Sequence, residues 1–288
     1  MELINKQHYM LAFLFSVALT AGLYAAAPTQ EQQIILLLLF AGLIGIPHGL
    51  TDWWLLPNAS KRIGFSGSVA KLRAIGVAIY LLLMACFLMF WFVFPVAGLA
   101  IFLCLSMWHF GMQDARAHGL SDVQRMIHGP LRGASLIFII YLAHPQTSEY
   151  FNLLTQSNMF TPIVTNHNEA IWLALLYILA SVSTMRWRYI CESALLMTML
   201  IMLPPLLSFT LYFCIWHTPR HYMHALQYRS NHRQQIMKIM FFSVCAIFLL
   251  GYISTVVSFE AKMQHMVVFF QLLAALTFSH VVLNRSEG

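Results

Sequence analysis

Charged side chains are scarce in this sequence. They account for 9% of the 288 residues, whereas hydrophobic residues account for 60%, and the mean hydropathy is +0.72. Soluble domains carry about 25% charged residues, so too few are present here to cover a water-facing surface. The five cysteines lie in apolar stretches and show no CxxC spacing. These shortages exclude a soluble enzyme, a disordered chain and a secreted disulfide scaffold, and they indicate an integral membrane protein.

Long apolar runs take the place of the missing charge. Runs of about 20 uncharged residues match the thickness of a hydrocarbon core, and IILLLLFAGLIGI lacks the alternation of a β-barrel strand. We therefore predict an all-α, polytopic transmembrane helix bundle that forms a single integral-membrane domain over residues 1–288. Because three blocks are short, eight full spans with re-entrant pieces are an alternative to ten helices. The predicted helices are 8–27, 33–56, 72–95, 96–112, 131–144, 168–184, 190–204, 206–228, 236–256 and 264–283.

The basic residues support this helix count. With ten spans, 15 of the 16 Lys and Arg residues fall on one side, and only Lys262 falls on the other. This count includes Arg132, at the start of the block 131–144. The positive-inside rule predicts that the basic side, with both termini, is cytoplasmic. Because the charges are spread over every inner loop, they predict no nucleic-acid partner.

Histidines are unusually frequent, with 13 against only ten acidic residues. Several stand in Gly- or Pro-rich breaks near the ends of the second, fourth, eighth and tenth blocks. In a bundle with both termini inside, these even-numbered helices all end on the cytoplasmic side. Ionisable groups inside spans are costly unless they have a partner or a function. The sequence therefore predicts one layer of imidazoles, contributed by His48, His109, His217, His221, His224 and His280.

This layer is a candidate metal site. Imidazole suits Fe, Zn, Cu and Ni. His217 and His221 are four residues apart, so on a continuous helix they share a face, although Pro219 lies between them. Four of these histidines, His48, His109, His217 and His221, share the layer and flank Gly or Pro, so we expect them to be functional, with His224 and His280 in secondary roles.

Two aspartates accompany these histidines. Asp52 follows His48 by four residues and Asp114 follows His109 by five. Either carboxylate can accept a hydrogen bond from the second ring nitrogen of a ligand histidine, which is a common arrangement at metal sites. Alternatively, each can bind a cytoplasmic arginine such as Arg116 or Arg220.

The other histidines have a simpler interpretation. A single histidine at a membrane interface usually forms a hydrogen bond with a backbone carbonyl. We expect this of His8, His118, His128, His144, His167, His232 and His265.

The histidine segments resemble the bacteriorhodopsin-related-protein-like (Brp/Blh) family of membrane β-carotene dioxygenases. Four motifs occur in the family's order over most of the chain, with departures at Leu50, at Trp53 and at Thr218-Pro219. The matching elements are Pro47-His48-Gly49 with Asp52, His109-Phe110-Gly111 with Asp114, Arg132-Gly133 through His144-Pro145, and His217 to His221 with Arg220, followed by a late His280.

The resemblance implies a non-haem Fe(2+) site of four histidines, His48, His109, His217 and His221, with His280 as an alternative ligand. It implies that O2 cleaves the central double bond of β-carotene or a related carotenoid, giving two molecules of all-trans-retinal. It further implies a location in the bacterial inner membrane, embedded in the lipid bilayer, with a microbial rhodopsin as a candidate acceptor of retinal. The bilayer location agrees with the residues themselves, since a wholly apolar polyene dissolves in lipid.

Two other classes of function remain as alternatives. Membrane di-iron hydroxylases and desaturases also place histidines near cytoplasmic helix ends, but they need about eight in HxxxH and HxxHH boxes. A non-enzymatic haem bundle needs two facing histidines, and a transporter more often shows paired halves with broken helices at the midplane.

Overall fold

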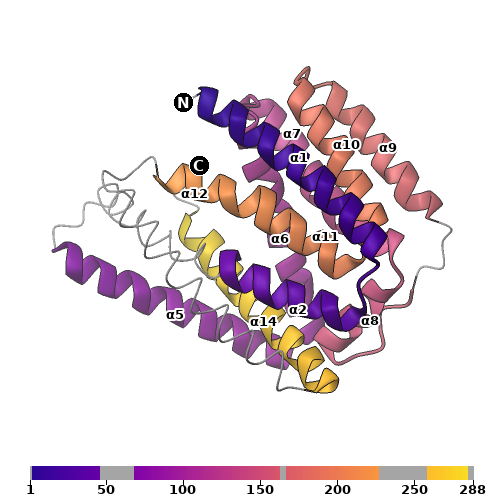
Figure 1. Cartoon of the computed structure of the whole chain (residues 1–288). Coiled ribbons are helices and arrows are strands. Elements are labelled where there is room, and N and C mark those ends of the chain that lie inside the picture. Colours follow the sequence, from indigo (N-terminus) through magenta and orange to yellow (C-terminus); the bar gives the residue numbers. More distant parts are fainter. Residues whose placement is uncertain (1, 46–67, 163–166, 227–257, 285–288) are drawn as a thin grey trace. The chain divides into compact units, whose positions relative to one another are not determined.

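The computed structural model describes residues 2–45, 68–162, 167–226 and 258–284. All regular elements in these ranges are helices, which confirms the predicted all-α bundle. Figure 1 shows their order along the chain. Two of them are π-helices, labelled η. The elements are α1 (Glu2–Ala26), α2 (Gln30–Phe40), η1 (Ala41–Gly45), α5 (Val69–Val93), α6 (Pro95–Ala117), α7 (Asp122–Ala143), α8 (Gln146–Thr155), α9 (Asn168–Val182), α10 (Trp187–Met202), α11 (Pro205–Leu211), η2 (Tyr212–His217), α12 (Thr218–Leu226) and α14 (Phe259–Asn284).

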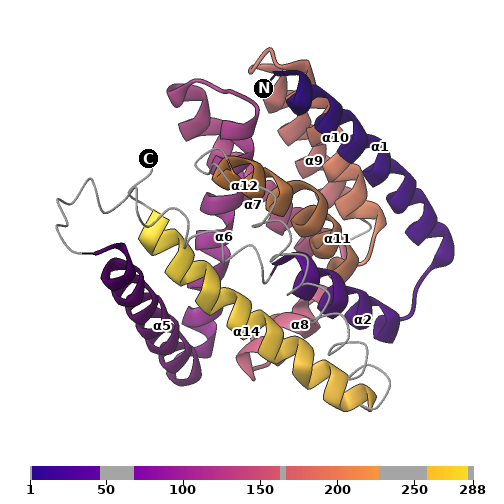
Figure 2. The same cartoon turned by 60° about the vertical axis from the view of Figure 1, so that its left-hand side comes forward.

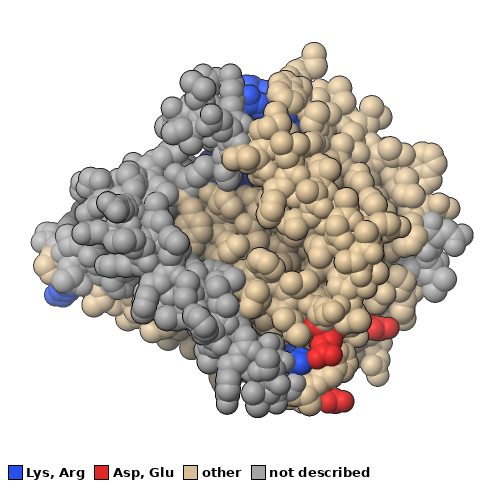
Figure 3. Space-filling view, viewed as in Figure 1, with Lys and Arg blue, Asp and Glu red and all other residues tan. Residues whose placement is uncertain are grey.

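Five helices in the described ranges are long and apolar enough to cross a membrane: Tyr9–Ala26, Ala74–Val93, Pro95–Ala117, Asp122–Ala143 and Phe259–Val282. Their large apolar side chains are often exposed, for example Leu82 at 63% and Phe92 at 65%. In Figure 3 the visible face carries few charged atoms outside the grey region. Lipid tails are the medium in which such a surface is stable, so the helices belong to a membrane protein.

The chain divides into two compact units that interleave along the sequence. The first unit comprises Met1–Leu37, Ser106–Leu153 and Ser157–His217, and the second comprises Leu38–Leu105, Leu154–Gln156 and Thr218–Gly288. The boundary near the motif histidines falls between His217 and Thr218. A single domain over residues 1–288 stays a prediction.

In the first unit, α7 packs against α9 and α10, and α1 packs against α10. Both views show these helices side by side (Figures 1 and 2). The hydroxyl of Tyr9 on α1 donates a hydrogen bond to the Arg188 carbonyl of α10 at 3.0 Å.

Glycines bring α6 and α7 unusually close together. Gly129 and Gly133 are four residues apart, so they share a face of α7, and Gly111 faces them from α6. A Cβ on Gly133 would lie 1.7 Å from the Met107 carbonyl oxygen, and one on Gly111 would lie 1.8 Å from the Gly129 oxygen. Only glycine permits this approach, which is a common way to pack helices in membranes.

Three features of this region differ from the sequence prediction. Helix α7 begins at Asp122 rather than at residue 131, because Ser121 and Gln124 form a reciprocal capping box and Pro130 is accommodated inside the helix. Arg132 therefore lies well inside a helix rather than at its start. The segment 145–167, which lies between the predicted helices 131–144 and 168–184, contains α8, and α6 is longer than predicted.

In the second unit, α5 lies along α14 in both views. Tyr80 donates to the Leu276 carbonyl at 3.2 Å, and Ser279 donates to the Tyr80 carbonyl at 3.3 Å. The rings of Phe87 and Phe278 stack with centroids 4.8 Å apart. These contacts position the end of α14 that carries His280.

Candidate functional site

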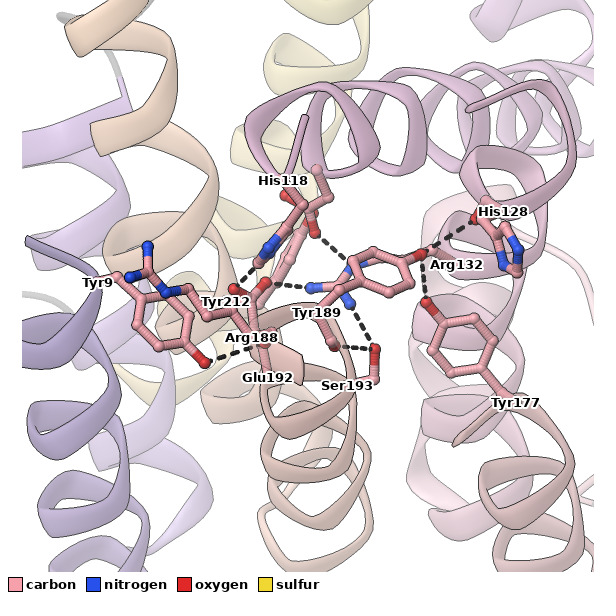
Figure 4. Close-up of polar contacts among 11 residues, drawn as sticks. Tyr9, His118, His128, Arg132, Tyr177, Arg188, Tyr189, Glu192, Ser193 and Tyr212 are labelled. Atoms are coloured by element: carbon pink, nitrogen blue, oxygen red, sulfur yellow. Dashed lines mark hydrogen bonds and ion pairs between the residues drawn. The ribbon is translucent and has the colours of Figure 1, made fainter. Parts of the chain in front are cut away.

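Arg132 is the centre of a buried ion cluster in the first unit (Figure 4). Its Nε donates to Asp114 Oδ2 at 2.7 Å, its Nη1 donates to Ser193 Oγ at 2.9 Å, and its Nη2 forms an ion pair with Glu192. All four side chains are fully buried. Buried charges are tolerated only when paired and hydrogen-bonded, so the guanidinium satisfies two carboxylates from α6 and α10.

The cluster extends in two directions. His118 Nε2 lies 2.8 Å from Glu192 Oε2, and the hydroxyl of Tyr212 donates to Asp114 Oδ2 at 3.2 Å. Two carboxylates thus share one guanidinium, and His118 supplies a second nitrogen partner to Glu192. Four elements, α6, α7, α10 and η2, are thereby joined through polar groups inside a membrane protein.

His109 and His217 lie together in the first unit. Their ring centroids are 5.1 Å apart and the rings are inclined by 72°. Phe110 contacts the His217 ring edge-on at 4.5 Å, and Phe213 stacks on it at 5.5 Å. His217 is 1% exposed. Aromatic rings thus surround the His217 imidazole, whose nitrogens are the type of donor that binds a metal.

His221 and His280 form a similar pair in the second unit. Their centroids are 5.0 Å apart with the rings at 67°, and both side chains are buried. His221 lies on α12, four residues after His217, and His280 lies on α14. Next to His221, the hydroxyl of Tyr222 donates to the carbonyl of Ile44 in η1 at 3.3 Å.

The remaining predicted residues have no described position. His48 and Asp52 lie outside the described residues, and so does the side chain of His224. Among the described side chains, no group of three or more His, Cys, Asp or Glu is arranged to hold a metal ion. The structure thus brings four of the predicted histidines together as two pairs, one in each unit.

A family model described as beta-carotene 15,15'-dioxygenase matches residues 37–286. The chain belongs to this family. It is 30% identical over 256 residues to a beta-carotene 15,15'-dioxygenase of the uncultured marine bacterium 66A03, an alignment that covers 83% of this chain and 88% of the relative. It is 25% identical over 235 residues to the probable beta-carotene 15,15'-dioxygenase Blh of Halobacterium salinarum, covering 73% of this chain and 67% of the relative. No solved structure matches the chain.

Membership of the beta-carotene 15,15'-dioxygenase family confirms the resemblance noted in the sequence and the predicted class of enzyme. The matched region contains every predicted site residue, from His48 to His280. It also contains Arg132 and Glu192, so the ion cluster lies within the part of the chain that the family shares.

Sequence reasoning missed most of the ion cluster. Asp114 was expected to meet Arg116 or Arg220 if it bound an arginine, but Arg132 is the arginine that contacts it. Glu192 was not singled out, although an acid within the apolar run CESALLMTML is itself a signal of a buried partner or function.

The hydrogen bonds to backbone carbonyls that were predicted for the other histidines are confirmed in part. The prediction of a backbone partner is confirmed for His144, whose Nε2 lies 2.8 Å from the Leu200 carbonyl oxygen, and for His265, whose Nδ1 lies 2.5 Å from that of Ala261. It is wrong for His118, which pairs with Glu192.

Proposed function

We propose that this protein uses O2 to cleave the central double bond of β-carotene or a related carotenoid, giving two molecules of all-trans-retinal. The proposal includes one Fe(2+) ion held by His48, His109, His217 and His221, with His280 as the alternative ligand. Family membership supports the reaction, because the two relatives described above are named beta-carotene 15,15'-dioxygenase and probable beta-carotene 15,15'-dioxygenase Blh. The two histidine pairs, in which His217, His221 and His280 are buried, support the metal.

The donor set fits iron. His217, His221 and His280 are each less than 10% exposed, and imidazole nitrogen is a good ligand for Fe(2+). The rings of Phe110 and Phe213 pack against His217, so its imidazole lies in an apolar setting. When bound, Fe(2+) supplies the activation of O2 that an unassisted protein side chain cannot provide.

Connectivity within the second unit supports including His48. The Tyr222 hydroxyl, one residue after His221, donates to the carbonyl of Ile44, four residues before His48. This bond ties the chain entering the His48 motif to the helix that carries His221. His217 belongs to the same continuous helical stretch as His221, only four residues earlier.

The protein's own groups bind, orient and exclude water. The aromatic rings around His217 keep water from that imidazole. Asp114, fixed by Arg132 and Tyr212, holds the helix that carries His109, and we propose that Asp52 has a comparable orienting role beside His48. Adding O2 across one C=C bond to give two C=O bonds consumes no proton, so the reaction itself needs no acid or base.

The substrate enters from the lipid. β-Carotene is a hydrocarbon without a polar group, so it partitions into the bilayer core, where the exposed apolar helices lie. A membrane-embedded site receives such a molecule without moving it through water.

Alanine substitution of each proposed ligand tests the function. In a carotenoid-producing bacterial host, the wild-type protein should remove the orange pigment and produce retinal. His48→Ala, His109→Ala, His217→Ala and His221→Ala should each lose both iron and cleavage. His265→Ala is the matched control, because its ring is exposed on the same helix as His280.

The outcomes separate the alternatives. If His280→Ala abolishes iron binding while one of the four variants keeps iron and activity, His280 replaces that ligand. Purified wild-type protein with a Soret band would identify a haem protein and refute the proposal. Wild-type protein that leaves the pigment intact would also refute it.

We also propose that the protein spans the bacterial inner membrane with both termini in the cytoplasm. The asymmetry of Lys and Arg supports this orientation. Reporter fusions after Gly98 and after Ser230 should then report opposite sides of the membrane, and the same side for both would contradict it.

A further inference from the structure

The helical segment from Pro205 to Leu226 is interrupted by a π-helix. Helix α11 gives way to η2 at Tyr212, and η2 ends at His217, where α12 follows. A π-helix forms i→i+5 hydrogen bonds, is rare, and occurs mostly as a single turn near functional sites. The predicted ligand His217 is therefore the last residue of an uncommon turn.

Helix α6 contacts both ends of this turn through adjacent residues. At the end, Gln113 Nε2 donates to the carbonyl oxygen of His217 at 3.3 Å. At the start, Asp114 Oδ2 accepts a hydrogen bond from the hydroxyl of Tyr212, with 3.2 Å between the two oxygens. All of these residues belong to the first unit.

The same face of α6 carries the rings that contact His217. His109 and Phe110 precede Gln113 and Asp114 by four residues each, the spacing of neighbours on one helix face. Their ring centroids lie 5.1 Å and 4.5 Å from that of His217. One face of α6 thus holds the backbone of the π-turn and contacts the imidazole at its end.

The register of the turn decides where His217 points. An α-helix rotates by about 100° per residue. Conversion of the π-turn to α-helix changes the register by one residue, so it would turn His217 by about that angle relative to Tyr212. The ring would then leave His109. The two contacts from α6 oppose this conversion.

We propose that Gln113 and Tyr212 are positioning residues that hold η2 in its π-helical register, so that the His217 imidazole faces His109. Asp114 provides the acceptor for Tyr212, and Arg132 fixes Asp114 from α7. The role assigned to the imidazoles rests on the proposed function.

The test removes each contact without removing bulk. Tyr212→Phe deletes only a hydroxyl, and Gln113→Leu replaces an amide with an apolar group of similar size. Thr210→Val is the matched control, because the buried Thr210 hydroxyl bonds to Leu206 of its own helix at 2.6 Å. Each protein is loaded with Co2+ in place of iron. The visible absorption spectrum then reports ligand geometry, and titration gives the affinity.

Loss of a group that orients a metal ligand typically costs about 10–100-fold in metal affinity. Tyr212→Phe and Gln113→Leu should each weaken Co2+ binding by about that factor and alter its spectrum. The double variant should bind Co2+ only slightly more weakly than the single variant with the lower affinity, because either change releases the same turn. Thr210→Val should match the wild type in both measurements.

The results distinguish this inference from the proposed function. Wild-type protein that binds neither Co2+ nor Fe2+ overturns both. If the wild type binds Co2+ and the two variants have its affinity and spectrum, only the positioning role is overturned. Equal weakening in Thr210→Val also overturns it, because a general loss of a buried polar group then explains the effect.

Discussion

Replacement of Arg132 by Met should be among the most damaging single changes outside the histidines. Met has a similar length and fills the space, but it removes three hydrogen-bond donors and the guanidinium that joins Asp114 to Glu192. The buried carboxylates of Asp114 and Glu192 then lose their ion pairs with the guanidinium. Removing one partner of a buried ion pair typically costs about 3–5 kcal/mol. Because Arg132 serves two carboxylates, we expect the upper end of that range.

Two further variants show whether charge is the cause. Arg132→Lys keeps the charge but lacks the planar fork that reaches three partners, and hydrogen bonds to charged groups contribute about 1.5–3 kcal/mol each. We expect a loss of about 2–3 kcal/mol. The triple variant Arg132→Met, Asp114→Asn, Glu192→Gln removes all three charges together. It should recover at least half of the loss, because no unpaired charge stays buried.

The assay is reversible unfolding in mixed detergent micelles, followed by tryptophan fluorescence, which gives the free energy of unfolding. Arg125→Met is the control on the same helix, since Arg125 pairs with the exposed Asp122 and exposed pairs contribute about 0–1 kcal/mol. A loss for Arg132→Met no larger than for Arg125→Met would refute the account. So would a triple variant less stable than Arg132→Met.

Two more changes test separate features. Gly133→Ala should lower the free energy of unfolding by at least about 2 kcal/mol, because the new Cβ would lie 1.7 Å from the Met107 carbonyl oxygen. Gly22→Ala should not lower it, because a Cβ there has nothing within 4 Å. Equal effects in the two variants would contradict the packing argument. Burial lowers the pKa of His144 below its usual 6.5, against the opposing effect of its hydrogen bond to Leu200. Near pH 6.5 and below, the unfolded chain therefore binds more protons at His144 than the folded protein does, so the free energy of unfolding should fall as pH drops from 7 to 5. His144→Gln should show a shallower fall in the same assay. An identical slope for the variant and the wild type would contradict this.

The helices were largely predictable because a membrane-spanning helix has a long uncharged sequence. Blocks such as 8–27 and 168–184 agree with α1 and α9 to within a few residues, apart from the early start of α1. The start of α7 was missed because Pro130 resembles a helix start, while the true signal is the Ser121–Gln124 capping box. Helix α8 was missed because its sequence is polar and short.

The site was predictable only where local spacing carried it. The motifs marked His109, His217, His221 and His280, and the structure brings them together in pairs. The contacts of Glu192 join residues 60 and 74 positions away in the sequence, and no helical period reveals such partners. The π-turn at Tyr212 was equally hidden, because its hydrophobic pattern reads as ordinary helix.

The spacing of the ion cluster sets an order of assembly during synthesis. Asp114 and Arg132 are 18 residues apart on consecutive helices, so they can enter the bilayer as a paired hairpin. A single charge at the centre of an inserting helix costs about 2.5–3.5 kcal/mol; Arg132 lies near the middle of α7, and pairing with Asp114 within the hairpin offsets part of its cost. Glu192 emerges from the ribosome 60 residues after Arg132, when its counter-charge is already in the membrane. Arg132 can thus pair first with Asp114, which is synthesised before it, and then with Glu192, which is synthesised after it.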